Sequence, residues 1–402
     1  MRSFEPDTSA SSTRRVMLYS HDTFGLGHLR RSRALASAIT QADAQTSALI
    51  LTGSPVAGRF TFPERVDHIR LPGVTKLSDG SYVSQTLGLD IDDTTALRAG
   101  LIQSAIERFE PNLLIVDKEP TGFRGELLPT LEWIKMRGRT RTVLGLRDVL
   151  DEPEVLAAEW DRKGSLSATE GLYDEIWIYG LRNIYDPTQG LALSDDTRRR
   201  MHWTGYLRRE VTDGSDTPST PYILITPGGG GDGAAMVSLA LQAYEQDPTL
   251  KPDAFLVYGP FLSGEVRDAF DARVAKLGGR VTAAGFDSKI EALFAGAEGV
   301  VCMGGYNTFC EVLSFDKPAV ILPRTKPRLE QWIRASQAEQ LGLVRMLDVH
   351  RDEMTPRAMI EAIRRLPSQN KPSKGQATGL LDGLDVVVDR TRALIGAVGA
   401  AA

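Results

Sequence analysis

The chain has 402 residues, of which 42% are hydrophobic and 25% are charged, and its formal net charge at pH 7 is −5. This composition is typical of globular proteins, and the length favours two domains over a single core. The acidic balance excludes a general nucleic-acid binder, which needs a basic face, so we expect no nucleic-acid partner.

The sequence contains no apolar run of the roughly 18 residues that cross a bilayer, and its polar first residues lack the apolar core of a signal peptide. We therefore expect a cytoplasmic protein without a transmembrane segment, with residues 1–14 disordered; peripheral membrane contact stays open. The two cysteines, Cys302 and Cys310, are interpreted as buried packing residues, because no metal-ligand spacing includes them.

Strand and helix patterns alternate through residues 15–211, which predicts crossover connections, a parallel sheet and therefore an α/β domain. The predicted strands are Arg15–Tyr19, Ala48–Thr52, Leu113–Val116, Thr142–Leu146, Glu175–Tyr179 and His202–Leu207, and the predicted helices are His28–Ile39 and Thr94–Glu110.

Residues 212–221 are rich in Pro, Ser, Thr, Asp and Gly, which predicts a linker. The same alternation then predicts a second doubly wound domain over residues 222–375, and a helix within residues 376–402 that packs back on the first domain. The predicted strands are Tyr222–Thr226, Ala254–Tyr258, Val281–Ala283, Gly299–Met303 and Ala319–Leu322, and the predicted helices are Ala234–Gln246, Glu265–Leu277, Lys289–Phe294, Thr308–Phe315, Glu330–Leu341 and Gly383–Val398.

Three glycine-rich turns each follow a predicted strand and precede a predicted helix, at residues 25–28, 228–233 and 303–306. In doubly wound sheets such turns present backbone N–H groups to phosphate. The second turn matches the Gly-x-Gly-x-x-Gly dinucleotide fingerprint, but the next strand ends at Tyr258 without the acid that binds a ribose, which argues against NAD. No Gly-Lys-Ser/Thr is present, so a P-loop is excluded and a general phosphate-facing turn is favoured.

Thr308 and Glu311 match a helix capping box, which is the favoured interpretation of this spacing alone. The preceding Gly304 and Gly305 favour a ligand site instead. A glutamate on the first turn at a sheet's carboxyl edge can reach a ribose while the helix N-terminus holds phosphate.

His28 follows the first turn, at the edge of the sheet where ligands bind. Isolated histidines are more often structural, but at this place a general base is expected. Arg30, in the basic start of the following helix, is a candidate for neutralising phosphate. Asp90, Asp92 and Asp93 end no recognisable strand, so we interpret them as a solvated loop or helix start and expect no metal site.

These motifs resemble those of the two-domain GT-B glycosyltransferases. More narrowly they resemble glycosyltransferase family 28, the group that includes the N-acetylglucosaminyltransferase of lipid II synthesis and many bacterial predicted glycosyltransferases. The similarity spans most of residues 15–345, and it is carried by residues 24–31, 228–233, 285–290, 303–311 and 327–331. It implies a GT-B fold, in which two Rossmann-like, doubly wound parallel-sheet domains face each other across a cleft.

The resemblance also implies roles for individual residues, with a UDP-sugar as the donor and no cofactor or metal. Its diphosphate would be lined by Gly229, Gly230, Gly231, Gly304, Gly305 and Asn307, with Thr308 in the same motif. Glu311 would bind the ribose, Phe286 and Ile290 would flank the base, Glu330 and Gln331 would hold sugar hydroxyls, and His28 would face the reacting centre.

The acceptor side is less defined, because the first domain resembles the family more loosely. The candidates at or just beyond its strand ends are Gly27, Arg30, Lys118, Glu119, Arg124, Arg147 and Asp148. Salt-bridged loop residues are the equally weighted alternative. The acceptor stays open among a lipid, a polysaccharide, a peptide and a small metabolite.

We therefore expect a metal-independent, inverting glycosyltransferase that moves a sugar from a nucleotide sugar to an acceptor hydroxyl. A UDP-sugar hydrolase on the same fold is the first alternative, because Gly25, Gly27, His28 and Arg31 also resemble a turn of some hydrolases of nonulosonate biosynthesis. A sugar-nucleotide epimerase and a non-catalytic sugar-nucleotide-binding protein are further alternatives.

Overall fold

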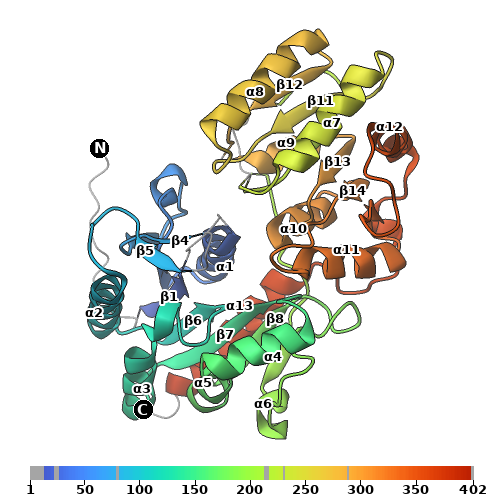
Figure 1. Cartoon of the computed structure of the whole chain (residues 1–402). Helices are drawn as coiled ribbons and strands as arrows, with labels where there is room; N and C mark the ends of the chain where they lie inside the picture. Colours follow the sequence, from blue (N-terminus) through green and yellow to red (C-terminus); the bar gives the residue numbers. More distant parts are fainter. Residues whose placement is uncertain are drawn as a thin grey trace.

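Two parallel sheets, each flanked by helices, make up the protein (Figure 1). The computed structural model describes residues 13–21, 27–77, 81–211, 217–229, 231–287 and 289–399. We call the first sheet with its helices the N-terminal domain and the second the C-terminal domain. The chain is thus an α/β protein with two Rossmann-like domains, as predicted.

The N-terminal sheet has the strand order β3-β2-β1-β6-β7-β8-β9 and is parallel throughout. Its strands are β1 (Arg14–Ser20), β2 (Thr46–Thr52), β3 (Val66–Arg70), β6 (Leu113–Asp117), β7 (Arg141–Arg147), β8 (Glu175–Tyr179) and β9 (Met201–Trp203). Its helices are α1 (Gly27–Ala42), α2 (Ile91–Phe109), α3 (Leu128–Arg137), α4 (Pro153–Arg162), α5 (Ser165–Leu172) and α6 (Asp195–Arg199). An antiparallel hairpin of β4 (Val74–Lys76) and β5 (Tyr82–Ser84) precedes α2.

The C-terminal sheet has the strand order β12-β11-β10-β13-β14-β15, again parallel throughout. Its strands are β10 (Tyr222–Thr226), β11 (Asp253–Val257), β12 (Val281–Ala284), β13 (Gly299–Cys302), β14 (Ala319–Ile321) and β15 (Arg345–Met346). Its helices are α7 (Ala234–Gln246), α8 (Gly264–Val274), α9 (Ile290–Gly296), α10 (Tyr306–Ser314), α11 (Glu330–Gln340) and α12 (Pro356–Arg365).

Each sheet reverses its direction of winding once, between β1 and β6 in the first domain and between β10 and β13 in the second. The loops after these strand pairs lead to opposite faces of the sheet and leave a crevice at its carboxyl edge, where ligands bind in such folds. The central strands are buried on both faces, and all five residues of both β6 and β10 are buried. Such continuous apolar sequences are typical of strands in a parallel sheet whose two faces are both covered by helices.

The last helix, α13 (Gly383–Gly399), returns to the N-terminal domain and packs against α1, β6 and β7. Figure 1 shows it in red beside β7, far from α7 and α8. Arg392 on α13 donates a hydrogen bond to the carbonyl of Ala42 at the end of α1, over 2.8 Å. The chain therefore crosses between the domains twice, once before β10 and once before α13.

Most predicted strands lie within one residue of the observed bounds, but the strand expected at 202–207 was too long. It ends at Trp203, because the chain turns at Gly205, whose φ is +88°, and Leu207 then forms a bridge with Asp382. Strand β1 begins at Arg14, within the segment expected to be disordered. Residues 1–12, and 212–216 of the expected linker, lie outside the described residues. Within the described ranges, no helix is long and apolar enough to cross a membrane.

Candidate active site

A pocket of about 210 Å³ lies between the domains, lined by residues that follow β1, β10 and β13. The predicted site residues that line it are Gly27, His28, Arg30, Arg147, Gly229, Gly231, Phe286, Ile290, Gly305, Asn307, Thr308, Glu311 and Gln331. The predicted residues outside its wall are Gly304, Lys118, Glu119, Arg124, Asp148 and Glu330. Gly230 lies outside the described residues.

Glycine residues line one side of the pocket, and we call this side the glycine wall; Gly304 lies directly behind it, next to the lining residue Gly305. Gly304 has a φ of +70°, and a Cβ there would lie 2.7 Å from Cγ2 of Ile321. Gly259 has a φ of +88°, and its Cβ would lie 2.3 Å from the carbonyl oxygen of Gly228. Both positions require glycine, because a side chain would be strained and would also collide with its neighbour.

Helix α10 presents its N-terminus at this wall. Its N-cap is Gly305, and no side chain caps its first turn. The first N–H groups of the helix are therefore open to an anionic ligand. The capping-box interpretation is wrong, because Thr308 lies inside the first turn and lines the pocket.

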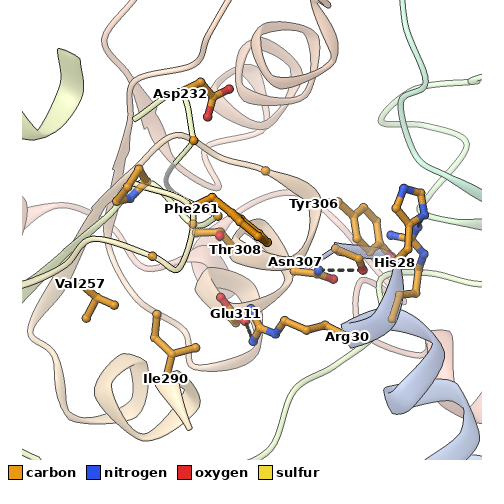
Figure 2. A pocket seen from close by; sticks show the side chains of 18 of the residues that line it. His28, Arg30, Asp232, Val257, Phe261, Ile290, Tyr306, Asn307, Thr308 and Glu311 are labelled. Atoms are coloured by element: carbon orange, nitrogen blue, oxygen red, sulfur yellow. Dashed lines mark hydrogen bonds and ion pairs between the residues drawn. The ribbon is translucent and has the colours of Figure 1, made fainter. Parts of the chain in front are cut away.

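Glu311 is a carboxylate buried in this pocket, with 1% of its side chain exposed. Arg30 of α1 reaches across from the other domain and donates a hydrogen bond to Glu311 (Figure 2) and another to Glu291. Burial raises the pKa of Glu311 to about 7, and this rise is opposed by Arg30 and increased by Glu291. Arg30, predicted for the acceptor side, thus contacts carboxylates of the C-terminal domain.

Asn307 joins the two domains at the centre of the pocket. Its Nδ2 donates to the carbonyl of Gly27 over 3.0 Å, and its Oδ1 accepts from Nη2 of Arg209 over 2.9 Å. The bond to Gly27 connects the first turn of α10 to the start of α1.

Aromatic and aliphatic side chains line the end of the pocket near α9. Phe286 and Ile290 come from the C-terminal domain, and Phe60 of the N-terminal domain completes this wall. The rings of Phe60 and Phe286 meet edge to face at a centroid distance of 6.3 Å. The guanidinium of Arg33 lies over the ring of Phe60, 5.4 Å from its centroid. Such an apolar end can hold a planar base.

His28 belongs to a buried group at the carboxyl ends of β1 and β6. Its Nδ1 lies 2.5 Å from Oδ2 of Asp117, and Arg31 donates two further bonds to that carboxylate, over 2.6 and 2.7 Å. Burial opposes ionisation of Asp117, but Arg31 and His28 hold its pKa well below the usual range. Because an ionised carboxylate only accepts hydrogen bonds, Nδ1 of His28 carries a proton, and in the neutral imidazole the lone pair is then on Nε2.

Comparisons with known proteins agree with this geometry. Residues 223–380 match the family model described as the glycosyltransferase family 28 C-terminal domain. No curated protein sequence matches the chain significantly. The C-terminal domain is therefore of the glycosyltransferase family 28 type, and the chain as a whole has the GT-B fold.

Several solved glycosyltransferase structures share the fold of this chain at low sequence identity. MurG of Acinetobacter baumannii is 14% identical with a TM-score of 0.56, and the match covers 94% of this chain and 99% of that one. The calicheamicin glycosyltransferase CalG4 is 16% identical with a TM-score of 0.55, covering 95% and 98%. Phytolacca americana UGT2, solved with UDP-2-fluoro-glucose and pterostilbene, is 13% identical with a TM-score of 0.61, covering 96% and 99%.

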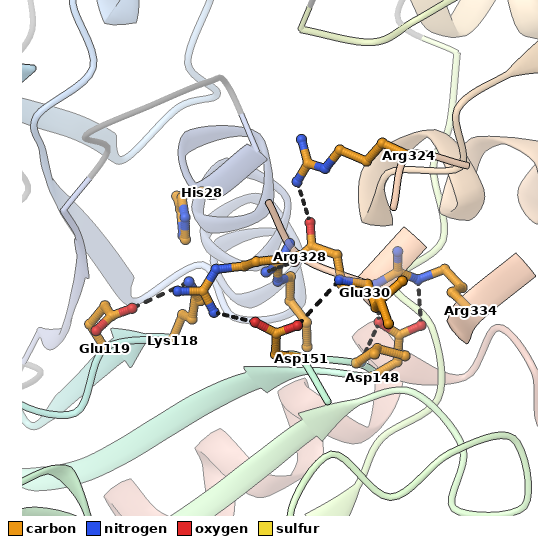
Figure 3. A network of polar contacts seen from close by, with 12 residues as sticks. His28, Lys118, Glu119, Asp148, Asp151, Arg324, Arg328, Glu330 and Arg334 are labelled. Carbon is orange, nitrogen blue, oxygen red and sulfur yellow. Dashed lines mark hydrogen bonds and ion pairs between the residues drawn. The ribbon is translucent and has the colours of Figure 1, made fainter. Parts of the chain in front are cut away.

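An ion-pair network joins the domains beside the pocket (Figure 3). Arg147 donates to Glu330 over 2.7 Å, and Arg324 donates to the same carboxylate over 2.8 Å. Burial works against ionisation of Glu330, but Arg147 and Arg324 hold its pKa at about 2. Gln331 accepts a hydrogen bond from the backbone N–H of Arg324 over 3.1 Å.

Asp148 lies in a buried interdomain ion pair rather than in the pocket wall. Both its oxygens accept from Arg334, over 2.6 and 2.7 Å, and Tyr206 donates to it over 2.9 Å. Arg334 also donates to the carbonyl of Gly304 over 3.0 Å. The pair therefore supports the glycine wall from behind.

Lys118 and Glu119 lie at the end of β6, outside the pocket. They form an ion pair of 3.3 Å, and Lys163 bonds Glu119 over 2.9 Å. Arg124 pairs with Asp92 over 2.6 Å on an exposed surface. These contacts fit the alternative interpretation of salt-bridged loop residues.

The acidic cluster near residue 90 starts a helix, as expected. Asp90 is the N-cap of α2, and its side chain accepts from the backbone N–H of Asp93 over 2.8 Å. Nowhere in the described part of the chain do three His, Cys, Asp or Glu side chains come together as metal ligands would.

Sequence analysis missed Asp117, Phe60, Glu291 and Arg334 as parts of the site, whereas Arg31 was named only as a member of the first glycine turn. One signal was present for Asp117, because it ends the strand that lies beside β1 at the winding reversal. The other three act through partners far away in the sequence, for which the local pattern carries no signal.

Proposed function

We propose that this protein is a glycosyltransferase that moves a sugar from a UDP-sugar to an acceptor hydroxyl, with inversion and without a metal ion. The observation that carries the proposal is one pocket lined by a histidine from one domain and by a glycine wall, a helix N-terminus and a buried carboxylate from the other. A cytoplasmic location stays a prediction, and the acceptor stays open.

The donor would bind mainly to the C-terminal domain. Its diphosphate would meet the N–H groups of the glycine wall and of α10, and its ribose hydroxyls would donate to Glu311. Its base would lie at the apolar end, between Phe286 and Ile290. Gln331 at the pocket wall, and Glu330 behind it, would hold sugar hydroxyls.

His28 would act as the general base. Asp117 holds the Nδ1 proton, so Nε2 can accept the proton of the acceptor hydroxyl. As the acceptor oxygen bonds to the anomeric carbon, the bond from that carbon to the diphosphate breaks, and the diphosphate leaves with the electron pair. Backbone N–H groups stabilise the charge that develops on it, which is a role that needs no metal ion.

The first experiment incubates the protein with a panel of sugar nucleotides and a chelator, without an acceptor. It measures thermal stabilisation and nucleotide release together. Selective stabilisation by one UDP-sugar with little UDP release supports a transferase and identifies its donor. Rapid release of UDP or sugar phosphate supports the hydrolase alternative, and no stabilisation by any sugar nucleotide overturns the donor site.

A variant separates catalysis from binding. His28→Ala is expected to keep donor binding and to lower turnover by about 10² to 10⁴-fold, which is the usual contribution of a general base. His350→Ala is the matched control, because His350 is exposed and does not line the pocket. Unchanged turnover in His28→Ala would remove the histidine from the mechanism.

A further inference from the structure

One guanidinium from the N-terminal domain serves two carboxylates of the C-terminal domain. Nη2 of Arg30 donates to Oε1 of Glu311 and, over 2.8 Å, to Oε1 of Glu291. All three side chains are largely buried, with 15% of Arg30, 11% of Glu291 and 1% of Glu311 exposed. Figure 2 shows Arg30 extending from α1 to Glu311 on α10.

The two carboxylates differ in their access to the pocket. Glu311 and Arg30 line it, whereas Glu291 does not. In the ligand-free protein, Arg30 is therefore hydrogen-bonded to the carboxylate that a ribose would need. This bond takes Oε1 only, so a ribose whose two hydroxyls bond both oxygens of Glu311 must displace the arginine from Oε1.

Glu291 offers the displaced arginine a second position. Its Oε2 is buried and has no hydrogen-bond partner among the described residues. A guanidinium has several N–H donors in a planar fork, so Arg30 can form a two-bond pair with Glu291 once it leaves Glu311. The pKa of Glu291 is lowered, since Arg30 outweighs the effect of burial, which favours its ionised form as the partner.

We propose that Arg30 is a cross-domain gate on the ribose subsite, and that Glu291 is the positioning residue that holds the gate open. Without donor, Arg30 bonds both carboxylates. With donor, the ribose hydroxyls take Glu311, and Arg30 stays on Glu291, so the domains remain joined. This inference rests on the proposed function, because it assigns the ribose to Glu311.

The gate selects a class of ligand. Only a nucleotide with ribose hydroxyls can replace the N–H donors of Arg30 at Glu311. A nucleotide without the 2′ and 3′ hydroxyls leaves that arginine in place and gains nothing from the carboxylate. The protein therefore discriminates between UDP and 2′,3′-dideoxy-UDP, and the discrimination depends on Glu291.

The test is the ratio of the Kd of 2′,3′-dideoxy-UDP to that of UDP, measured by calorimetry on the full chain. We expect at least about tenfold in the wild type, because a site built for hydroxyls rejects an analogue that lacks them. Glu291→Gln is expected to lower the ratio to below about threefold, since Arg30 then remains on Glu311. Arg30→Met combined with Glu291→Gln is expected to restore it.

The ratio cancels any general weakening of the domain interface, which affects both nucleotides equally. Glu361→Gln on α12 is the matched control, since that residue is exposed. The gate would be overturned if Glu291→Gln left the Kd ratio unchanged. It would also be overturned if the ratio stayed low in the double variant. If the wild type binds no UDP at all, the proposed function itself fails; if it binds UDP with a ratio near one, only the ribose assignment fails.

Discussion

Replacement of Glu311 by glutamine tests how much the free energy of unfolding is lowered by burying this carboxylate in the pocket. Glu311→Gln preserves the shape of the side chain and leaves an oxygen that accepts from Arg30. Arg30 also keeps Glu291 as its ionic partner. The substitution therefore removes a buried charge without leaving a buried cation unpaired.

The magnitude follows from the pKa of Glu311, which burial raises from about 4.5 to about 7. Between these values the folded protein holds a proton that the unfolded chain has lost, so stability falls as the pH rises through this window. A shift of about 2.5 pKa units corresponds to roughly 3 kcal/mol. That cost is absent below pH 4.5 and complete above pH 7, and the variant is expected to lack it.

The assay is thermal or urea unfolding of both proteins in steps from pH 4.5 to pH 8. We expect Glu311→Gln to equal the wild type at the acid end and to exceed it by up to about 3 kcal/mol at pH 8. Glu361→Gln, at the surface, is the control and should follow the wild type. Parallel pH curves for Glu311→Gln and the wild type would show that Glu311 carries no such cost, which refutes the reasoning.

Three further predictions concern the rest of the site. Asp117→Asn is expected to keep UDP binding and to lower kcat by about 10⁴-fold, because His28 loses the carboxylate that orients it; titration and single-turnover kinetics check this. Arg334→Met should destabilise the protein by about 3–5 kcal/mol in urea unfolding, because Asp148 stays buried without its partner, and adding Asp148→Leu should recover part of the loss. Saturating EDTA should leave turnover unchanged; a loss that one divalent ion restores would contradict the proposed mechanism.

The fold was predictable where burial is complete. Strands such as Leu113–Asp117 and Tyr222–Thr226 must be apolar on both faces, so their sequences are continuous hydrophobic runs. Strand β3 was missed because it lies at the edge of the sheet, and its sequence Val-Asp-His-Ile-Arg is largely exposed. Helix α12 was missed because its sequence is rich in arginine, although Met359 and Ile363 bury one face.

The site was predictable only where one short segment carries it. The glycine turns and Glu311 are local features, since each stands next to the strand that positions it. Arg30 was assigned to the acceptor, but its partner Glu311 is 281 residues away. Asp148 was treated in the same way, although Arg334 is 186 residues away. Contacts between residues so far apart in the sequence depend on how the two domains pack together, and no local sequence pattern predicts this.

The return of α13 to the first domain has a consequence for synthesis. Ile39 on α1 and Ile395 on α13 lie in one apolar cluster, so the N-terminal domain is discontinuous in the sequence. A ribosome adding 5–20 residues per second needs roughly 10–40 s to go from residue 211 to residue 399. During that interval the nascent first domain carries an uncovered apolar strip along α1. A fragment that stops at residue 211 carries this strip permanently.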